Sequence, residues 1–175
     1  MTVALVVVAI VAVGAGAFAF GRLPARRSPS AGQRILVPFT GGMLDPTVLQ
    51  AAIRLARAEE ATLVPAYLLH VPLQYPEDSP LTDQVAVAMP LLEAVENAAQ
   101  RAGVAVDARI EKGRSSTHAL RRLWDVESFD RVIAPAPSNG SGGFTPNEVT
   151  WILAHAPAET IVLRPRSSLL GERSS

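Results

Sequence analysis

A glycine-rich segment of this 175-residue chain follows an apolar run and precedes a helical pattern. It contains Gly140, Gly142 and Gly143, and Asn147 lies four residues beyond the last of these glycines. Such a loop can hold phosphate by pointing backbone N–H groups at it, and an asparagine amide can donate to a phosphate oxygen. These four residues are therefore candidates for an anion or nucleotide site.

Other residues of the same segment argue against phosphate binding. Pro135, Pro137 and Pro146 lack the backbone N–H that a phosphate would need. Thr145 and Glu148 fit the capping-box pattern, in which a helix satisfies its own first N–H groups and places a carboxylate where a phosphate would lie. We therefore expect phosphate binding to be lost or weak. A flexible surface loop is the simpler interpretation of the glycines.

The remaining residue types form no catalytic or metal-binding pattern. The chain has no cysteine, and its three histidines, His70, His118 and His155, are not at metal-ligand spacing. No serine lies in a nucleophile-elbow motif. We expect no catalytic residue, no metal and no enzymatic activity. Trp124 and Trp151 lie on apolar helix faces and are predicted to be core residues.

The overall charge excludes one class of function. Sixteen basic and sixteen acidic side chains give a formal net charge of zero, whereas a nucleic-acid binder needs a basic excess to displace counterions. Lys112 is the single lysine, and such a preference for arginine is typical of GC-rich bacterial genomes.

The N-terminal segment Thr2–Phe20 contains nineteen residues without a charge, an amide or a proline. As a helix it would be about 28 Å long, close to the thickness of the hydrocarbon core of a bilayer. Four arginines follow it before the first acidic residue, Asp45, which places the C-terminal side in the cytoplasm by the positive-inside rule. We predict a transmembrane anchor over residues 1–20.

A cleaved signal peptide is the alternative for this segment, because Ala17-Phe18-Ala19 fits a cleavage site. A signal peptide, however, carries positive charge before its apolar core, and only Met1-Thr2 precedes this one. Residues 21–33 are rich in Pro, Ser, Gly and Arg and are predicted to be a linker. Their arginines set the topology or contact anionic lipid headgroups.

Residues 34–165 alternate between apolar runs and helical patterns. The predicted strands are residues 35–39, 62–71, 104–111, 131–135 and 160–164. Helical spacing follows Asp45-Pro46, covers 88–102, begins again after Ser115 or Ser116, and returns over 145–156. Five strands joined by helical crossovers predict an open, doubly wound parallel α/β sheet with helices on both faces. Residues 166–175 are predicted to be a disordered tail.

Several short motifs, taken in order, resemble the universal stress protein family. They are the first strand and its turn (ILVPFTGG), a second strand ending in LLHV, the glycine before the third helix, and the closing HAPAETIVLRP. The resemblance covers residues 34–165. It implies the strand order 3-2-1-4-5, a role in stress responses and a homodimer, and many members of the family bind ATP.

The sequence departs from the family at the nucleotide-binding positions. In ATP-binding members an acidic residue after the first strand contacts the nucleotide, and the matching residue here is Thr40, followed by Gly41. Where the family has its glycine motif after the fourth strand, this chain has Pro135, a position near Ser138, and Pro146-Asn147. If a nucleotide binds, the candidate residues are Thr40, Gly41, Gly140, Gly142, Gly143 and Asn147.

These observations favour a membrane-anchored, non-catalytic binding or regulatory module. A nucleotide sensor that uses a rebuilt glycine loop is the alternative, with ATP or AMP as the ligand. A small nucleotide hydrolase ranks below both. The expected partners are the bilayer, through Thr2–Phe20, a second copy of the chain and an unidentified protein, with no nucleic acid.

Overall fold

A computed structural model describes residues 32–136 and 142–165. The predicted anchor Thr2–Phe20, most of the linker, Gly140 and the tail 166–175 lie outside these residues. Among the helices within the described ranges, none has the length and apolar character needed to cross a membrane. The anchor therefore stays a prediction from the sequence.

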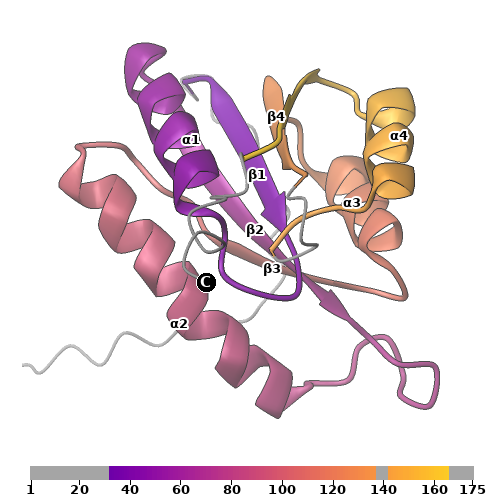
Figure 1. Ribbon diagram of the computed structural model, residues 1–175. Helices are drawn as coiled ribbons and strands as arrows, with labels where there is room; N and C mark the ends of the chain where they lie inside the picture. Colours follow the sequence, from indigo (N-terminus) through magenta and orange to yellow (C-terminus); the bar gives the residue numbers. More distant parts are fainter. Residues whose placement is uncertain (1–31, 137–141, 166–175) are drawn as a thin grey trace, which may run out of the picture.

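Five parallel strands form one sheet in the order β3-β2-β1-β4-β5 (Figure 1). The strands are β1 (Arg34–Phe39), β2 (Thr62–His70), β3 (Arg109–Gly113), β4 (Arg131–Pro135) and β5 (Glu159–Leu163). The helices are α1 (Pro46–Ala58), α2 (Thr82–Arg101), α3 (Ser116–Val126) and α4 (Pro146–His155). The predicted fold class and strand order are confirmed.

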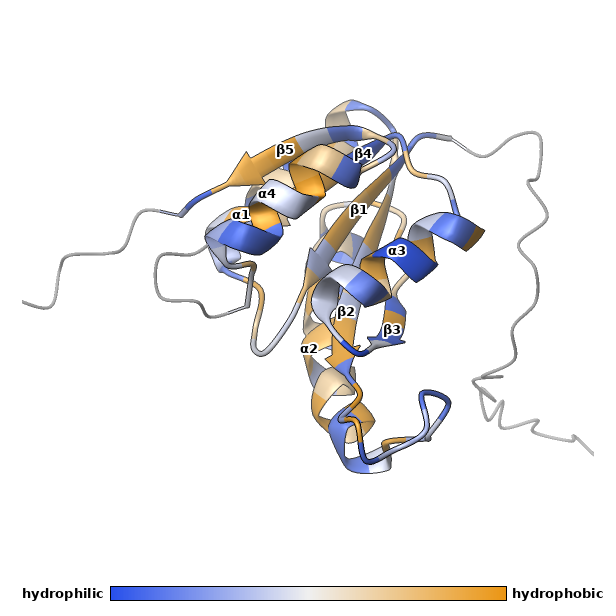
Figure 2. Ribbon diagram, turned by 90° about the vertical axis from the view of Figure 1, so that its right-hand side faces the viewer, coloured by the Kyte–Doolittle hydropathy of each residue, from blue (hydrophilic) through white to orange (hydrophobic). Residues whose placement is uncertain are grey.

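Helices cover both faces of the sheet, because successive strand side chains point to opposite sides. Ile35, Val37 and Phe39 of β1 pack in one core cluster with α1 and α2. Leu36 packs in a second cluster, to which α3 contributes several side chains and α4 contributes Ile152. Strands β1 and β2 are accordingly hydrophobic along most of their length (Figure 2). This burial on both faces is typical of parallel sheets.

Local sequence signals fix where the helices begin. The Asp45 carboxylate accepts a hydrogen bond of 2.7 Å from the backbone N–H of Thr47, and Pro46 occupies the first helical position of α1. The Ser115 hydroxyl caps α3 by accepting from the N–H of His118 at 3.1 Å. Both caps lie at the sheet edge where the strands end, as the sequence predicts.

The third strand differs from its prediction. The alternating pattern predicts a strand over 104–111, but β3 begins only at Arg109, and Val106 forms a single bridge to Leu63. The Asp107 carboxylate pairs with Arg34 at 2.9 Å and with Arg109. The Asp107 N–H still donates to the Leu63 carbonyl at 2.9 Å, so the chain stays beside β2 and regular pairing begins only at Arg109.

Candidate functional site

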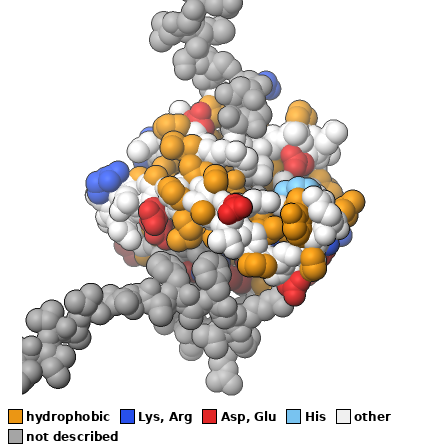
Figure 3. Space-filling model, turned by 90° about the horizontal axis from the view of Figure 1, so that it is seen from below, with side chains coloured by type: hydrophobic (Ala, Val, Ile, Leu, Met, Phe, Trp, Pro, Cys, Tyr) orange, Lys and Arg blue, Asp and Glu red, His pale blue; other side chains and the backbone are white. Residues whose placement is uncertain are grey.

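The candidate nucleotide site lies at the carboxyl ends of β1 and β4. These strands are neighbours at the point where the strand order reverses, which is where doubly wound folds bind ligands. Thr40 and Gly41 follow β1, and Gly142 and Gly143 lead into α4. Figure 3 looks onto this end of the molecule, where hydrophobic and uncharged side chains make up most of the visible described surface.

Gly142 brings the two loops into main-chain contact. Its φ is +68°, and a Cβ added to it would lie 2.2 Å from the carbonyl oxygen of Met43 and 3.0 Å from the carbonyl carbon. Only a residue without a side chain allows this approach. The loop before α4 therefore rests directly on the loop after β1, and the described backbone of Gly142 and Met43 leaves no gap between them.

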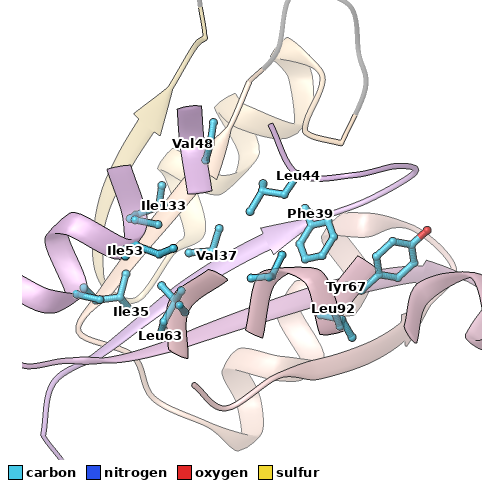
Figure 4. Close-up of a cluster of buried hydrophobic side chains, with 14 of the residues drawn as sticks. Ile35, Val37, Phe39, Leu44, Val48, Ile53, Leu63, Tyr67, Leu92 and Ile133 are labelled. Atoms are coloured by element: carbon cyan, nitrogen blue, oxygen red, sulfur yellow. The ribbon is translucent and has the colours of Figure 1, made fainter. Parts of the chain in front are cut away.

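Side chains on either side of this contact fill the space beneath it. Leu44 is 2% exposed and points into the core beside Phe39 (Figure 4). Phe144 is also 2% exposed and packs in the second core cluster. Its backbone N–H donates to the carbonyl of Pro135 at 2.8 Å. The Phe144 N–H is therefore already hydrogen-bonded within the chain and is not available to a ligand.

The helices that follow β1 and β4, α1 and α4, satisfy their own N-termini. Glu148 accepts from the Thr145 N–H at 2.8 Å, and the Thr145 hydroxyl accepts from the Glu148 N–H at 3.4 Å. This confirms the predicted capping box of α4. At α1 the Asp45 carboxylate has the equivalent role. Each helix therefore places a carboxylate of its own where an anion would otherwise bind.

The predicted site residues are only partly brought together. Gly142 and Gly143 are both buried, and Gly142 meets the loop that carries Thr40 and Gly41, but the contact runs through Met43. Asn147 is exposed in the first turn of α4, and Gly140 lies outside the described residues. Loop residues 40–45 and 142–148 contain two acidic side chains and no basic one. A phosphate there would meet no cation from either loop.

Comparison with known proteins addresses the fold. No family model and no curated protein matches the chain. A protein of the universal stress protein family from Burkholderia pseudomallei superposes with a TM-score of 0.57 at 21% identity, over 78% of this chain and 98% of that one. The chain has the universal stress protein fold.

Two further structures with this fold are similar at lower identity. A universal stress protein solved in complex with cAMP has a TM-score of 0.54 at 16% identity, over 77% of this chain and 98% of that chain. A universal stress protein from Archaeoglobus fulgidus has a TM-score of 0.54 at 12% identity, over 74% and 97%. The ligand of a neighbour remains a property of that neighbour.

Sequence reasoning missed a groove at the opposite edge of this universal stress protein fold. The groove lies between α3 and α4, and its lining residues are Arg121, Trp124, Asp125, Trp151, His155 and Pro157. Trp124 and Trp151 are half-buried, so their prediction as core residues is only partly right. The signal was present in the spacing, because Trp151 and His155 are one helical turn apart, as are Arg121 and Trp124.

The other titratable residues serve the structure of the loops. Glu77 pairs with Arg114 at 3.3 Å and with Arg122 at 3.4 Å, which fastens the loop after β2 to α3. His118 accepts from the Arg114 N–H at 3.2 Å. Among residues 32–136 and 142–165, no group of three metal-binding side chains is found.

Proposed function

We propose that this chain is a membrane-anchored, non-catalytic binding or regulatory module in which ATP binding is lost or weak. The observation that carries the proposal is the contact of Gly142 with the Met43 carbonyl. In a phosphate-binding loop a glycine lets the backbone approach the ligand, and here the same property lets it approach another loop. The crevice is then occupied by the chain itself.

The electrostatics of the crevice support the same proposal. The N-termini of α1 and α4 carry a partial positive charge, which Asp45 and Glu148 already neutralise. A triphosphate would have to displace these carboxylates or lie beside them, and like charges at short range repel. Pro146 removes a further N–H donor at the start of α4.

The anchoring part of the proposal rests on the sequence of Thr2–Phe20 and the arginines after it. It places the α/β domain on the cytoplasmic side of the membrane, tethered by residues 21–33. A domain held there acts by binding a partner or a signal close to the bilayer.

Calorimetric titration of the full chain in a mild detergent tests the nucleotide part. ATP, ADP, AMP and cAMP are each added, with an ATP-binding universal stress protein as a positive control. We expect no binding heat at ligand concentrations that saturate the control. A dissociation constant for ATP in the micromolar range would contradict the proposal.

A nucleotide sensor with a rebuilt glycine loop is the second candidate. It is favoured by the neighbour of this fold solved with cAMP. It predicts measurable binding of one nucleotide, weakened by Thr40→Ala and by Asn147→Ala, because these side chains would contact the ligand. Binding without turnover would support a sensor. ATP turnover that is lost in both variants would instead support a nucleotide hydrolase.

A further inference from the structure

The groove between α3 and α4 is an aromatic surface with a fixed geometry. Its volume is about 230 Å³. The indoles of Trp124 and Trp151 are stacked with centroids 5.5 Å apart and planes 5° apart. The His155 ring stacks on Trp151 at 4.7 Å and is held by a 2.8 Å contact between its Nδ1 and the Trp151 carbonyl oxygen. Three rings from two helices therefore form one stack that lines the groove.

Two polar groups of this groove have no partner in the described part of the chain. The Asp125 carboxylate is exposed and unpaired, although Arg121 lies one helical turn before it. The Arg121 guanidinium lies 5.4 Å from the ring centre of Trp151, where it makes a cation–π contact. The Trp124 Nε1 is buried with no acceptor among the described residues. The groove thus offers a free carboxylate beside aromatic rings, while the Trp124 N–H lies beneath the surface.

This combination matches a particular chemistry of ligand. The groove is smaller than the pockets that enclose drug-sized molecules, so it suits a few side chains of a peptide. Aromatic-lined grooves bind proline-rich segments, whose extended backbone has carbonyl groups without internal hydrogen bonds. A proline ring of such a segment could pack against the exposed parts of the tryptophans, and an arginine in the peptide could pair with the exposed Asp125.

A segment with this chemistry precedes β1 in the same chain. Residues 21–31 contain Pro24, Pro29, Arg22, Arg26 and Arg27, and no acidic residue. We propose that this part of the linker docks in the groove between α3 and α4, with an arginine on Asp125 and a proline against the tryptophans. The proposal does not depend on nucleotide binding or on the anchor.

The linker enters the domain at the amino end of β1, and the groove is lined by residues near the C-terminal ends of α3 and α4. Arg34 begins β1, its N–H donates to Asp130 at 2.7 Å, and its guanidinium lies over Phe129 at 5.2 Å. Phe129 and Asp130 both lie in the short segment between α3 and β4. Residues 21–31 can extend about 36 Å, which is several turns of a helix. The tether therefore starts beside the segment that follows α3, and its length suits docking against the end of that helix.

Limited proteolysis of the full chain in an uncharged detergent tests the docking. Trypsin cleaves after Arg26 and Arg27, and docking protects these bonds. A short tether keeps the linker at a local concentration in the millimolar range beside the groove, so that even weak docking is populated. Loss of the ion pair in Asp125→Asn should lower that population, and we expect cleavage to be about threefold faster. Glu93→Gln, which changes an exposed acid on α2, is the matched control and should cleave like the wild type.

Intrinsic fluorescence gives an independent readout, because the two tryptophans of the chain both line the groove. The double variant Arg26→Gln/Arg27→Gln should shift the emission to longer wavelength as the indoles become hydrated. Equal cleavage of Asp125→Asn and wild type, with unchanged emission in the double variant, would overturn the proposal.

Two further outcomes would also overturn it by naming another occupant. A fluorescence shift that depends on protein concentration would assign the groove to a second copy of the chain. Protection that appears only with anionic lipid vesicles, and equally in Asp125→Asn, would assign the arginines to the bilayer.

Discussion

At the scale of single residues, Gly142 has two properties that a phosphate-binding glycine also has. Its φ is positive and it allows a close approach of another group. The group that approaches is the Met43 carbonyl, so the glycine supports a contact between two loops of the same domain. A carbonyl oxygen is itself an acceptor and would repel a phosphate oxygen at this position.

We predict that Gly142→Ala destabilises the domain more than a glycine substitution made in open space. The alanine is strained at this φ and its Cβ would collide with Met43, so the free energy of unfolding should fall by about 2–3 kcal/mol. Gly41→Ala is the matched control, because its φ is +77° but no atom lies within 4 Å of the added Cβ. It should cost about 1 kcal/mol. Urea unfolding of both variants measures the difference, and equal losses would mean that the loop contact contributes nothing.

Only part of this site was predictable from single residues. The Thr145–Glu148 capping box is encoded by neighbours on one helix, and the structure confirms it. The contact of Gly142 with Met43 joins loops that are distant in the sequence, and nothing in the local pattern of glycines distinguishes it from a phosphate cradle. The core prediction for Trp124 is only partly right, because a tryptophan on an apolar helix face fits a half-buried position as well as a buried one.

At the scale of elements, the helices that follow β1 and β4 start with their own acidic caps. Both starts lie at the carboxyl edge of the sheet, next to the crevice. These caps fix the angle at which each helix leaves its loop. A phosphate at the start of either helix would therefore meet a carboxylate that already caps it.

We predict that Thr145→Ala lowers the free energy of unfolding by about 1 kcal/mol, because the α4 cap is lost. Thr150→Ala is the control from the same helix. Its hydroxyl only bonds back to the Pro146 carbonyl at 3.0 Å, so the change should be neutral or slightly stabilising. Thermal unfolding of both variants checks the prediction, and it fails if Thr150→Ala costs as much as Thr145→Ala.

Central strands were better predicted than the edge strand. β1 and β4 are buried on both faces, so their apolar runs end within one residue of the observed bounds. β3 has a neighbour on one side only, its regular pairing begins only at Arg109, and the Asp107 side chain just before it forms ion pairs. Those ion pairs reach Arg34 and Arg109, and sequence alternation carries no information about them.

At the scale of the whole molecule, the two edges of the sheet differ in chemistry. The β3 edge carries Arg109, Glu111 and Lys112, and charges on an edge strand prevent pairing with another sheet. The β5 edge carries the sequence TIVL, appears hydrophobic in Figure 2, and leaves Val162 37% exposed. We propose that a second copy pairs with β5 to form the homodimer expected from the family resemblance.

Val162→Lys should then convert a dimer to a monomer, because a charge at the edge opposes pairing of two copies. Val87→Lys is the control, since Val87 is 63% exposed on α2, which packs against β2 and not against β5. Light scattering of the full chain in detergent gives the protein mass of each variant. A monomeric wild type, or a Val162→Lys variant that remains dimeric, would exclude this interface.

We also predict that the chain stays in the membrane fraction after alkaline carbonate extraction, because Thr2–Phe20 is long and apolar enough to span it. Deletion of residues 2–20 should release the domain. Intact mass of the extracted protein distinguishes an anchor from a signal peptide. Recovery of a chain that begins after Ala19 would show cleavage and contradict the anchor.

The most direct test of the closed crevice is amide NMR of the full chain titrated with ATP. The N–H signals of Gly142, Gly143 and Phe144 report on the positions where phosphate would bind. We predict that they keep their chemical shifts up to millimolar ATP, because the loop already rests on Met43. Saturable shifts at these amides and at Gly41, at micromolar ATP, would show that the crevice opens to a nucleotide and would contradict the proposed loss of ATP binding.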